Sequence, residues 1–92
     1  MSETRAEVSI GGRVQGVGFR FSTVRRAESL GLTGWVRNTM RGGVEAVFEG
    51  EERAVKQMVD WCRQGPRMAR VADIDVEYAE PTGEMSGFQV RF

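Results

Sequence analysis

The sequence predicts an α+β sandwich in which an antiparallel sheet carries two helices on one face, in the order β-α-β-β-α-β with a short extra strand at the C-terminal end. Two observations predict it. Apolar and polar residues alternate in four short segments, as in half-buried strands, and apolar residues recur at helical spacing in two others. Two βαβ halves of this length bury their apolar faces by placing both helices on the same side of the sheet, which is the ferredoxin-like arrangement.

The first strand and the first helix are expected on either side of a glycine-rich segment. Residues 6–14 predict a strand, because Val8, Ile10 and Val14 share one parity and polar residues share the other. Glycines at positions 16 and 18 then interrupt the alternation. Residues 21–30 predict a helix that ends at Gly31. Its expected buried face consists of Phe21, Val24, Ala27 and Leu30.

A hairpin and a second helix follow. Residues 32–38 and 44–48 predict two strands joined by a turn at residues 41–43. Val44, Ala46 and Phe48 are expected to face one side of the sheet, and Glu45 and Glu49 the other. After Gly50, an acidic pair and apolar residues at helical spacing predict a helix that ends near residues 65–66. Its apolar set is Val55, Met58, Val59 and Cys62.

The last third of the chain predicts two strands separated by a turn region at residues 81–87. Ile74, Val76 and Tyr78 alternate with acidic residues, and Phe88, Val90 and Phe92 alternate with polar ones. Parity therefore predicts that the three phenylalanines Phe48, Phe88 and Phe92 lie in the core. Trp35 has the opposite parity to Val36 and is expected on the open face of the sheet.

Length and composition limit the possible classes of protein. Ninety-two residues allow one hydrophobic core, so a single domain over residues 1–92 is expected. The 13 basic and 13 acidic side chains cancel, which argues against nucleic-acid or membrane partners bound by overall positive charge. A monomer is expected, although no residue pattern decides the oligomeric state. Cys62 is the only cysteine and is expected as a packed thiol. With no signal-like or membrane-spanning segment, the expected location is the cytoplasm.

The segment GRVQGVGFR, residues 12–20, is the strongest candidate for chemistry. Its glycines allow successive backbone N–H groups to converge where the following helix presents its own unpaired donors, and such a concavity favours phosphate. Arg20 could add two parallel hydrogen bonds to the same anion. Glycine-rich turns between a strand and a helix are also common as purely structural elements, and the residues alone leave both interpretations open.

Two long stretches resemble the signatures of the acylphosphatase family. They are GRVQGVGFR, residues 12–20, and GWVRNTMRGGV, residues 34–44. The similarity continues through Gly50, residues 65–66 and 69–71, and the Ser86-Gly87-Phe88 ending, so it covers nearly the whole chain. The resemblance implies a ferredoxin-like fold and the hydrolysis of acyl phosphates to a carboxylate and inorganic phosphate. It also implies that no metal or other cofactor is needed.

The resemblance also implies a role for each residue of the site. Arg20 binds the phosphate, Asn38 orients the attacking water, and the loop after the first strand supplies backbone N–H groups. These loop residues are Gln15, Gly16, Val17, Gly18 and Phe19. The expected ligands are a small acyl phosphate and inorganic phosphate or sulfate. The sequence agrees with direct attack by water, since it has no His and therefore no Ser-His or Cys-His pair.

Each role has an alternative. Asn38 could instead bond its own backbone at the start of the hairpin turn, and Arg20 could form a surface ion pair. The whole protein could be a non-catalytic phosphate-binding or acyl-phosphate-binding module. A basic rim that attracts anionic substrates is a further possibility, although exposed arginines are usually solvated; its candidates are Arg25, Arg26, Arg37 and Arg41. Met40, Arg41, Arg67 and Met68 occupy places outside the expected catalytic groups and leave the substrate preference open.

Overall fold

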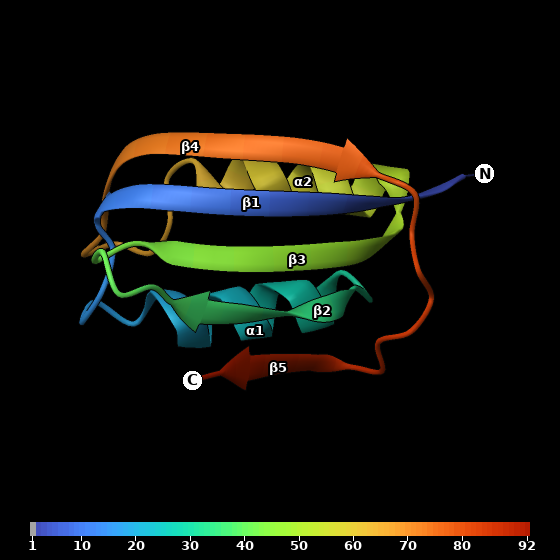
Figure 1. Ribbon diagram of the computed structural model, residues 1–92, viewed down its shortest axis with the longest axis horizontal. Helices are drawn as coiled ribbons and strands as arrows, with labels where there is room; N and C mark the ends of the chain where they lie inside the picture. Colours follow the sequence, from blue (N-terminus) through green and yellow to red (C-terminus); the bar gives the residue numbers. More distant parts are fainter. Residues whose placement is uncertain (1) are drawn as a thin grey trace.

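The computed structural model describes residues 2–92, which fold into a two-layer sandwich of one sheet and two helices (Figure 1). The elements are β1 (Glu3–Arg13), α1 (Phe19–Ser29), β2 (Thr33–Asn38), β3 (Val44–Glu51), α2 (Glu52–Cys62), β4 (Arg70–Ala79) and β5 (Phe88–Arg91). Both helices cover the same face of the sheet, and the other face is open (Figure 1). The predicted order of elements and the two-layer ferredoxin-like architecture are confirmed.

The sheet has the strand order β4-β1-β3-β2-β5. β1 pairs antiparallel with β3 and β4, and β2 pairs antiparallel with β3, as expected. β5 instead pairs parallel with β2, so the expectation of a wholly antiparallel sheet was wrong for this strand. The connection over residues 80–87 crosses from the β4 edge to the β2 edge at the end of the sheet where β4 finishes (Figure 1). β5 therefore starts at that end and runs in the same direction as β2.

The first helix differs from its prediction in its start and in its buried face. α1 begins at Phe19, two residues earlier than expected, and buries Phe19, Thr23 and Ala27. Phe21, which was expected in that face, is 77% exposed. The earlier start is set by Gly18, whose left-handed backbone ends the loop and caps the helix. The i, i+4, i+8 set therefore points to the sheet, and Phe21 is turned away from it.

The core lies between the sheet and the two helices. The rings of Phe48 and Phe88 stack within it at a centroid distance of 5.5 Å, as their parity predicts. Cys62 is fully buried, and burial raises the pKa of its thiol to about 12, so the expectation of a packed thiol is confirmed. Phe92 is fully exposed, contrary to prediction, because β5 ends one residue before it. Trp35 lies on the open face against the guanidinium groups of Arg37 and Arg91.

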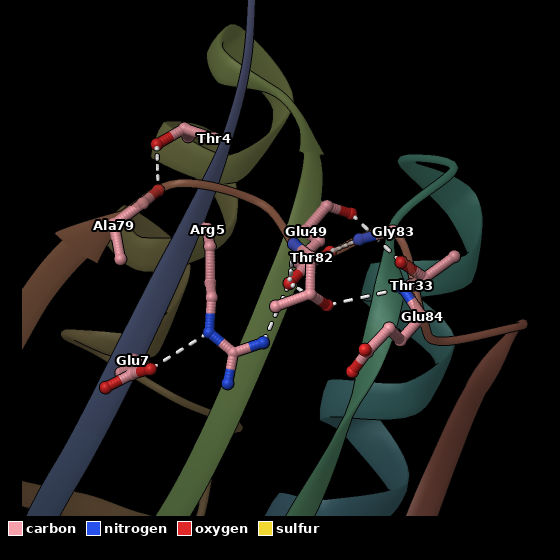
Figure 2. A network of polar contacts seen from close by, with 9 residues as sticks. All are labelled: Thr4, Arg5, Glu7, Thr33, Glu49, Ala79, Thr82, Gly83 and Glu84. Atoms are coloured by element: carbon pink, nitrogen blue, oxygen red, sulfur yellow. Dashed lines mark hydrogen bonds and ion pairs between the residues drawn. The ribbon is translucent and has the colours of Figure 1, made fainter.

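A buried carboxylate on the open face holds the β4–β5 connection in place (Figure 2). Glu49 faces this side of the sheet, as its parity predicts, yet it is only 4% exposed. It accepts hydrogen bonds from Arg5 Nη1 at 2.7 Å, from the Thr82 amide at 2.9 Å and hydroxyl at 3.0 Å, and from the Gly83 amide at 3.0 Å. The connection that decides the direction of β5 is therefore tied to β3, the middle strand of the sheet.

These contacts change the acidity of Glu49. Its pKa lies at about 2, below the ordinary value of 4.5. Burial by itself raises this pKa, but the hydrogen bonds from Thr82, Arg5 and Gly83 together outweigh burial and lower it. The folded state thus binds the proton more weakly than the unfolded state does. The carboxylate stabilises the fold above about pH 4.5, and this contribution is lost as the pH falls from 4.5 toward 2.

Glu49→Gln is expected to lower the free energy of unfolding near neutral pH by about 2–3 kcal/mol, because Arg5 loses a carboxylate and the connection loses an acceptor. The difference from the wild type should shrink below about pH 4, where the wild-type carboxylate begins to lose its own contribution. Urea unfolding at several pH values measures both effects. Glu45→Gln, which breaks an exposed pair with Arg37, should cost less than about 1 kcal/mol. An identical pH dependence in wild type and Glu49→Gln would contradict the account.

Candidate active site

The loop between β1 and α1 turns on two glycines. Gly16 and Gly18 have φ angles of 76° and 79°, a left-handed conformation that costs other residues about 1–2 kcal/mol. None of the amides of residues 15–20 donates a hydrogen bond to any group within the described chain. Their donors therefore remain available at the N-terminus of α1, where the helix dipole also favours an anion.

Both ends of this loop are anchored in the core. Val14 before it is 1% exposed, and Phe19 after it is 2% exposed. The Phe19 ring packs on Trp61 at a centroid distance of 5.5 Å. It also lies against Gly65, where an added Cβ would come within 2.4 Å of the ring, so glycine is required there. The side chain of Phe19 thus serves packing, while its amide lies in the first turn of α1.

The side chain of Gln15 ties the loop to the β2–β3 hairpin. Its Nε2 donates to the carbonyl oxygens of Thr39 and Gly43, both at 2.8 Å. The sequence predicted only a backbone contribution from Gln15, so this role was missed. A glutamine directly before a glycine-rich loop carries no signal of its partners, which lie 24 and 28 residues further along the chain.

These contacts bring the loop and the end of β2 around one cavity of about 180 Å³. Of the predicted site residues, the structure places five on its wall: Gly16, Gly18, Phe19, Arg20 and Asn38. Val14 and Phe21 complete the lining. Gln15 is turned to the hairpin instead, and Val17 lies in a neighbouring groove. The exposed ring of Phe21 therefore stands at the cavity and not in the core where it was predicted.

Arg20 is half-buried and forms no ion pair with any of residues 2–92. The alternative role of Arg20 in a surface ion pair is therefore not supported by these residues. Its guanidinium carbon lies 5.5 Å from the centre of the Phe92 ring. A guanidinium held over an aromatic face keeps its in-plane N–H donors free. Arg20 thus presents an uncompensated positive charge to the cavity that it lines.

Asn38 is the last residue of β2 and is half-buried. The structure gives its side chain no hydrogen bond to another described residue. The local contact that was the alternative for Asn38 is made by Thr39, whose hydroxyl accepts from the Gly43 amide at 3.0 Å. The side-chain amide of Asn38 therefore has both its donor and its acceptor available toward the cavity.

The four arginines proposed as a basic rim do not line this cavity. Arg37 pairs with Glu45 at 2.7 Å, Arg25 and Arg26 line a hollow beside Trp61, and Arg41 lines one beside the hairpin. Three other arginines lie next to the loop in a groove of about 280 Å³, which shares Gly16 with the cavity. They are Arg13, Arg67 and Arg70. Sequence reasoning missed this set, because its members come from β1, the α2–β4 connection and β4.

Comparison with known proteins decides the family, since the sequence model of the acylphosphatases matches residues 6–90. The chain belongs to the acylphosphatase family. Its activity is the hydrolysis of the carboxyl–phosphate bond of acyl phosphates. An acylphosphatase of a Nostoc species is 60% identical over 87 residues, which cover 95% of this chain and 85% of that protein. One from Pelotomaculum thermopropionicum is 50% identical over the full length of both chains.

The structural comparison agrees. The crystal structure of acylphosphatase from Bacillus subtilis superposes with a TM-score of 0.93 at 32% identity, covering 97% of this chain and 99% of that one.

Neither helix within residues 2–92 is long and apolar enough to cross a membrane. Across the same residues, no three His, Cys, Asp or Glu side chains gather closely enough to hold a metal ion.

Gln15→Ala is expected to lower kcat/KM by about tenfold, because losing both hydrogen bonds costs about 1–2 kcal/mol and lets the loop move away from Asn38. Steady-state hydrolysis of benzoyl phosphate, followed by ultraviolet absorbance, measures this effect. Gln64→Ala, an exposed glutamine outside the cavity, is the matched control. Unchanged kinetics in Gln15→Ala would show that the loop holds its position without this side chain.

Proposed function

We propose that the protein hydrolyses acyl phosphates by direct attack of water, with the loop over residues 15–19 and Arg20 holding the phosphate and Asn38 placing the water. The observation that carries this proposal is the shared cavity. Arg20 and Asn38 come from α1 and β2, yet both line one small hollow beside a loop whose amides have no partner within residues 2–92. Within residues 2–92, neither side chain forms a hydrogen bond or an ion pair that would explain its position.

The cavity suits the charge of the transition state. In phosphoryl transfer the developing charge spreads over the equatorial oxygens of the transferred group. The free amides after β1, the N-terminus of α1 and the Arg20 guanidinium are donors already held in position, so they need little reorganisation during the reaction. Arg20 can contribute two parallel hydrogen bonds, which also fix the orientation of the phosphate.

Asn38 supports the attack of water without acting as a strong base. Its Oδ1 can accept a hydrogen bond from the water while its Nδ2 donates to the water or to a phosphate oxygen. Water attacks phosphorus, the bond between phosphorus and the acyl oxygen breaks, and the acyl group leaves as a carboxylate. The proton of the water goes to the departing phosphate or to solvent. A carboxylate leaves readily from a mixed anhydride, so no general acid has to protonate it.

The proposal also covers the domain organisation, the location and the partners of the protein. One continuous core connects both helices and the sheet, which supports a single domain over residues 1–92, with Met1 outside the described residues. The fully buried free thiol of Cys62 supports a reducing compartment such as the cytoplasm. We expect a monomer without a cofactor, acting on a small molecule and binding neither nucleic acid nor membrane.

Asn38→Ala is expected to reduce kcat for benzoyl phosphate by about a hundredfold or more with KM changed only a few-fold, as for a contact made in the transition state.

Arg20→Ala should abolish both turnover and the binding of inorganic phosphate measured by calorimetry. Arg53→Ala, an exposed arginine at the start of α2, serves as the control. All assays contain a chelator, so that a metal requirement would appear as lost wild-type activity.

Two outcomes would overturn these roles. Full activity in Asn38→Ala would remove that residue from the mechanism. A wild-type protein that binds inorganic phosphate tightly through Arg20 but turns over no acyl phosphate would instead establish the non-catalytic binding module.

A further inference from the structure

We infer that the groove beside the phosphate loop binds a second negative charge on the substrate, so that the preferred acyl phosphates carry a carboxylate or another anion on their acyl group. The inference rests on the proposed function and extends it to the class of substrate. We call this hollow of about 280 Å³ the arginine groove; it is lined by Arg13, Gly16, Val17, Arg67, Met68 and Arg70.

The arginine groove adjoins the phosphate cavity and does not reach Asn38. Both hollows include Gly16, but only the phosphate cavity includes Asn38. In an in-line displacement, the attacking water and the leaving oxygen lie on opposite sides of phosphorus. With the water at Asn38, the acyl group points away from that residue. We place that acyl group in the groove that begins at Gly16, beside the cavity.

The three guanidinium groups of the groove lack the carboxylate partners that Arg5 and Arg37 have in the sheet. Arg5 and Arg37 lie opposite Glu49 and Glu45 in the strand ladder and form ion pairs with them. Arg13 lies opposite Arg70, and like charges in directly opposite positions destabilise a strand pair. Within residues 2–92, none of Arg13, Arg67 and Arg70 forms an ion pair, and no acidic residue lines the groove.

This arrangement produces a local positive potential in a chain whose formal net charge is zero. Packing does not explain it, because all three arginines are exposed. An anion in the groove would relieve their mutual repulsion and accept charge-assisted hydrogen bonds from planar guanidinium forks suited to a carboxylate or phosphate. A negative charge on the ligand would therefore complement the unpaired arginines of the groove.

The apolar lining of the groove fits the carbon skeleton that joins the phosphate to the second negative charge of the substrate. Val17 and Met68 provide apolar surface, and the Met68 side chain is 70% exposed although it is large and apolar. A flexible thioether adapts to differently shaped carbon skeletons. The groove volume equals that of roughly nine water molecules in the liquid, enough for a short chain or one ring.

A matched pair of substrates tests the inference. 4-Carboxybenzoyl phosphate and 4-methylbenzoyl phosphate have nearly the same shape and differ by one negative charge. We expect the wild type to prefer the carboxylated substrate by about tenfold in kcat/KM, the effect of one or two solvent-exposed charged contacts. Arg67→Gln and Arg70→Gln should each reduce this ratio several-fold, and the double variant should bring it close to one. Turnover of the methyl substrate should stay within about twofold.

Arg53→Gln separates contact in the groove from long-range attraction. It removes the same charge from the start of α2, which follows the end of β3 remote from Asn38. It should leave the substrate ratio unchanged. A wild-type ratio near one would overturn the inference, and so would a ratio that Arg53→Gln lowers as much as Arg67→Gln does.

Binding of the non-hydrolysable 4-carboxybenzylphosphonate and 4-methylbenzylphosphonate, measured by calorimetry, tests the groove without turnover. If neither acyl phosphate is hydrolysed but the carboxylated phosphonate binds about fivefold or more tightly through Arg67 and Arg70, the proposed function fails and the anion site stands. Equal affinities for the two phosphonates would refute the site even in an active enzyme.

Discussion

The side-chain amide of Gln15 is the contact on which the rest of the site depends. Its two hydrogen bonds to the carbonyls of Thr39 and Gly43 join the loop to the hairpin, two segments that are separated in the sequence by α1 and β2. Because Thr39 follows Asn38 directly, the same contact sets the distance between the phosphate loop and the residue proposed to place the water. Val14 and Phe19 hold the two ends of the loop in the core. The glycines between them therefore turn the backbone between two fixed positions.

One end of the sheet carries contacts that stabilise the fold, and the other end carries the candidate active site. At one end, Glu49 satisfies donors from Arg5, Thr82 and Gly83 and fastens the connection to β5. At the other end, the phosphate loop, the hairpin and the α2–β4 connection come together, and β5 also finishes there (Figure 1). The site end leaves amides and guanidinium groups without hydrogen-bond or ion-pair partners among residues 2–92. Such groups are available for an anion.

The distribution of arginines shows why net charge is a poor guide to this protein. Over the central sheet, arginines are neutralised by cross-strand carboxylates, as Arg37 is by Glu45. Beside the phosphate loop, the cross-strand neighbour of Arg13 is another arginine. Electrostatic interactions between exposed groups fade within about 10 Å at ordinary salt concentrations, so a locally unbalanced cluster acts on a ligand independently of distant acidic residues. Anion recognition is therefore compatible with a formal charge of zero.

The sequence by itself determined the order of the elements, the parity of β3, the buried face of α2 and the family, because these depend on periodicity and motifs within short segments. It did not determine the parallel direction of β5, the exposure of Phe21 and Phe92, the burial of Glu49 or the arginine groove. These follow from which distant segments meet. The alternation of apolar and polar residues predicts which face of a strand is buried. Only the register of neighbouring strands and the course of the connections decide which residues lie against that face.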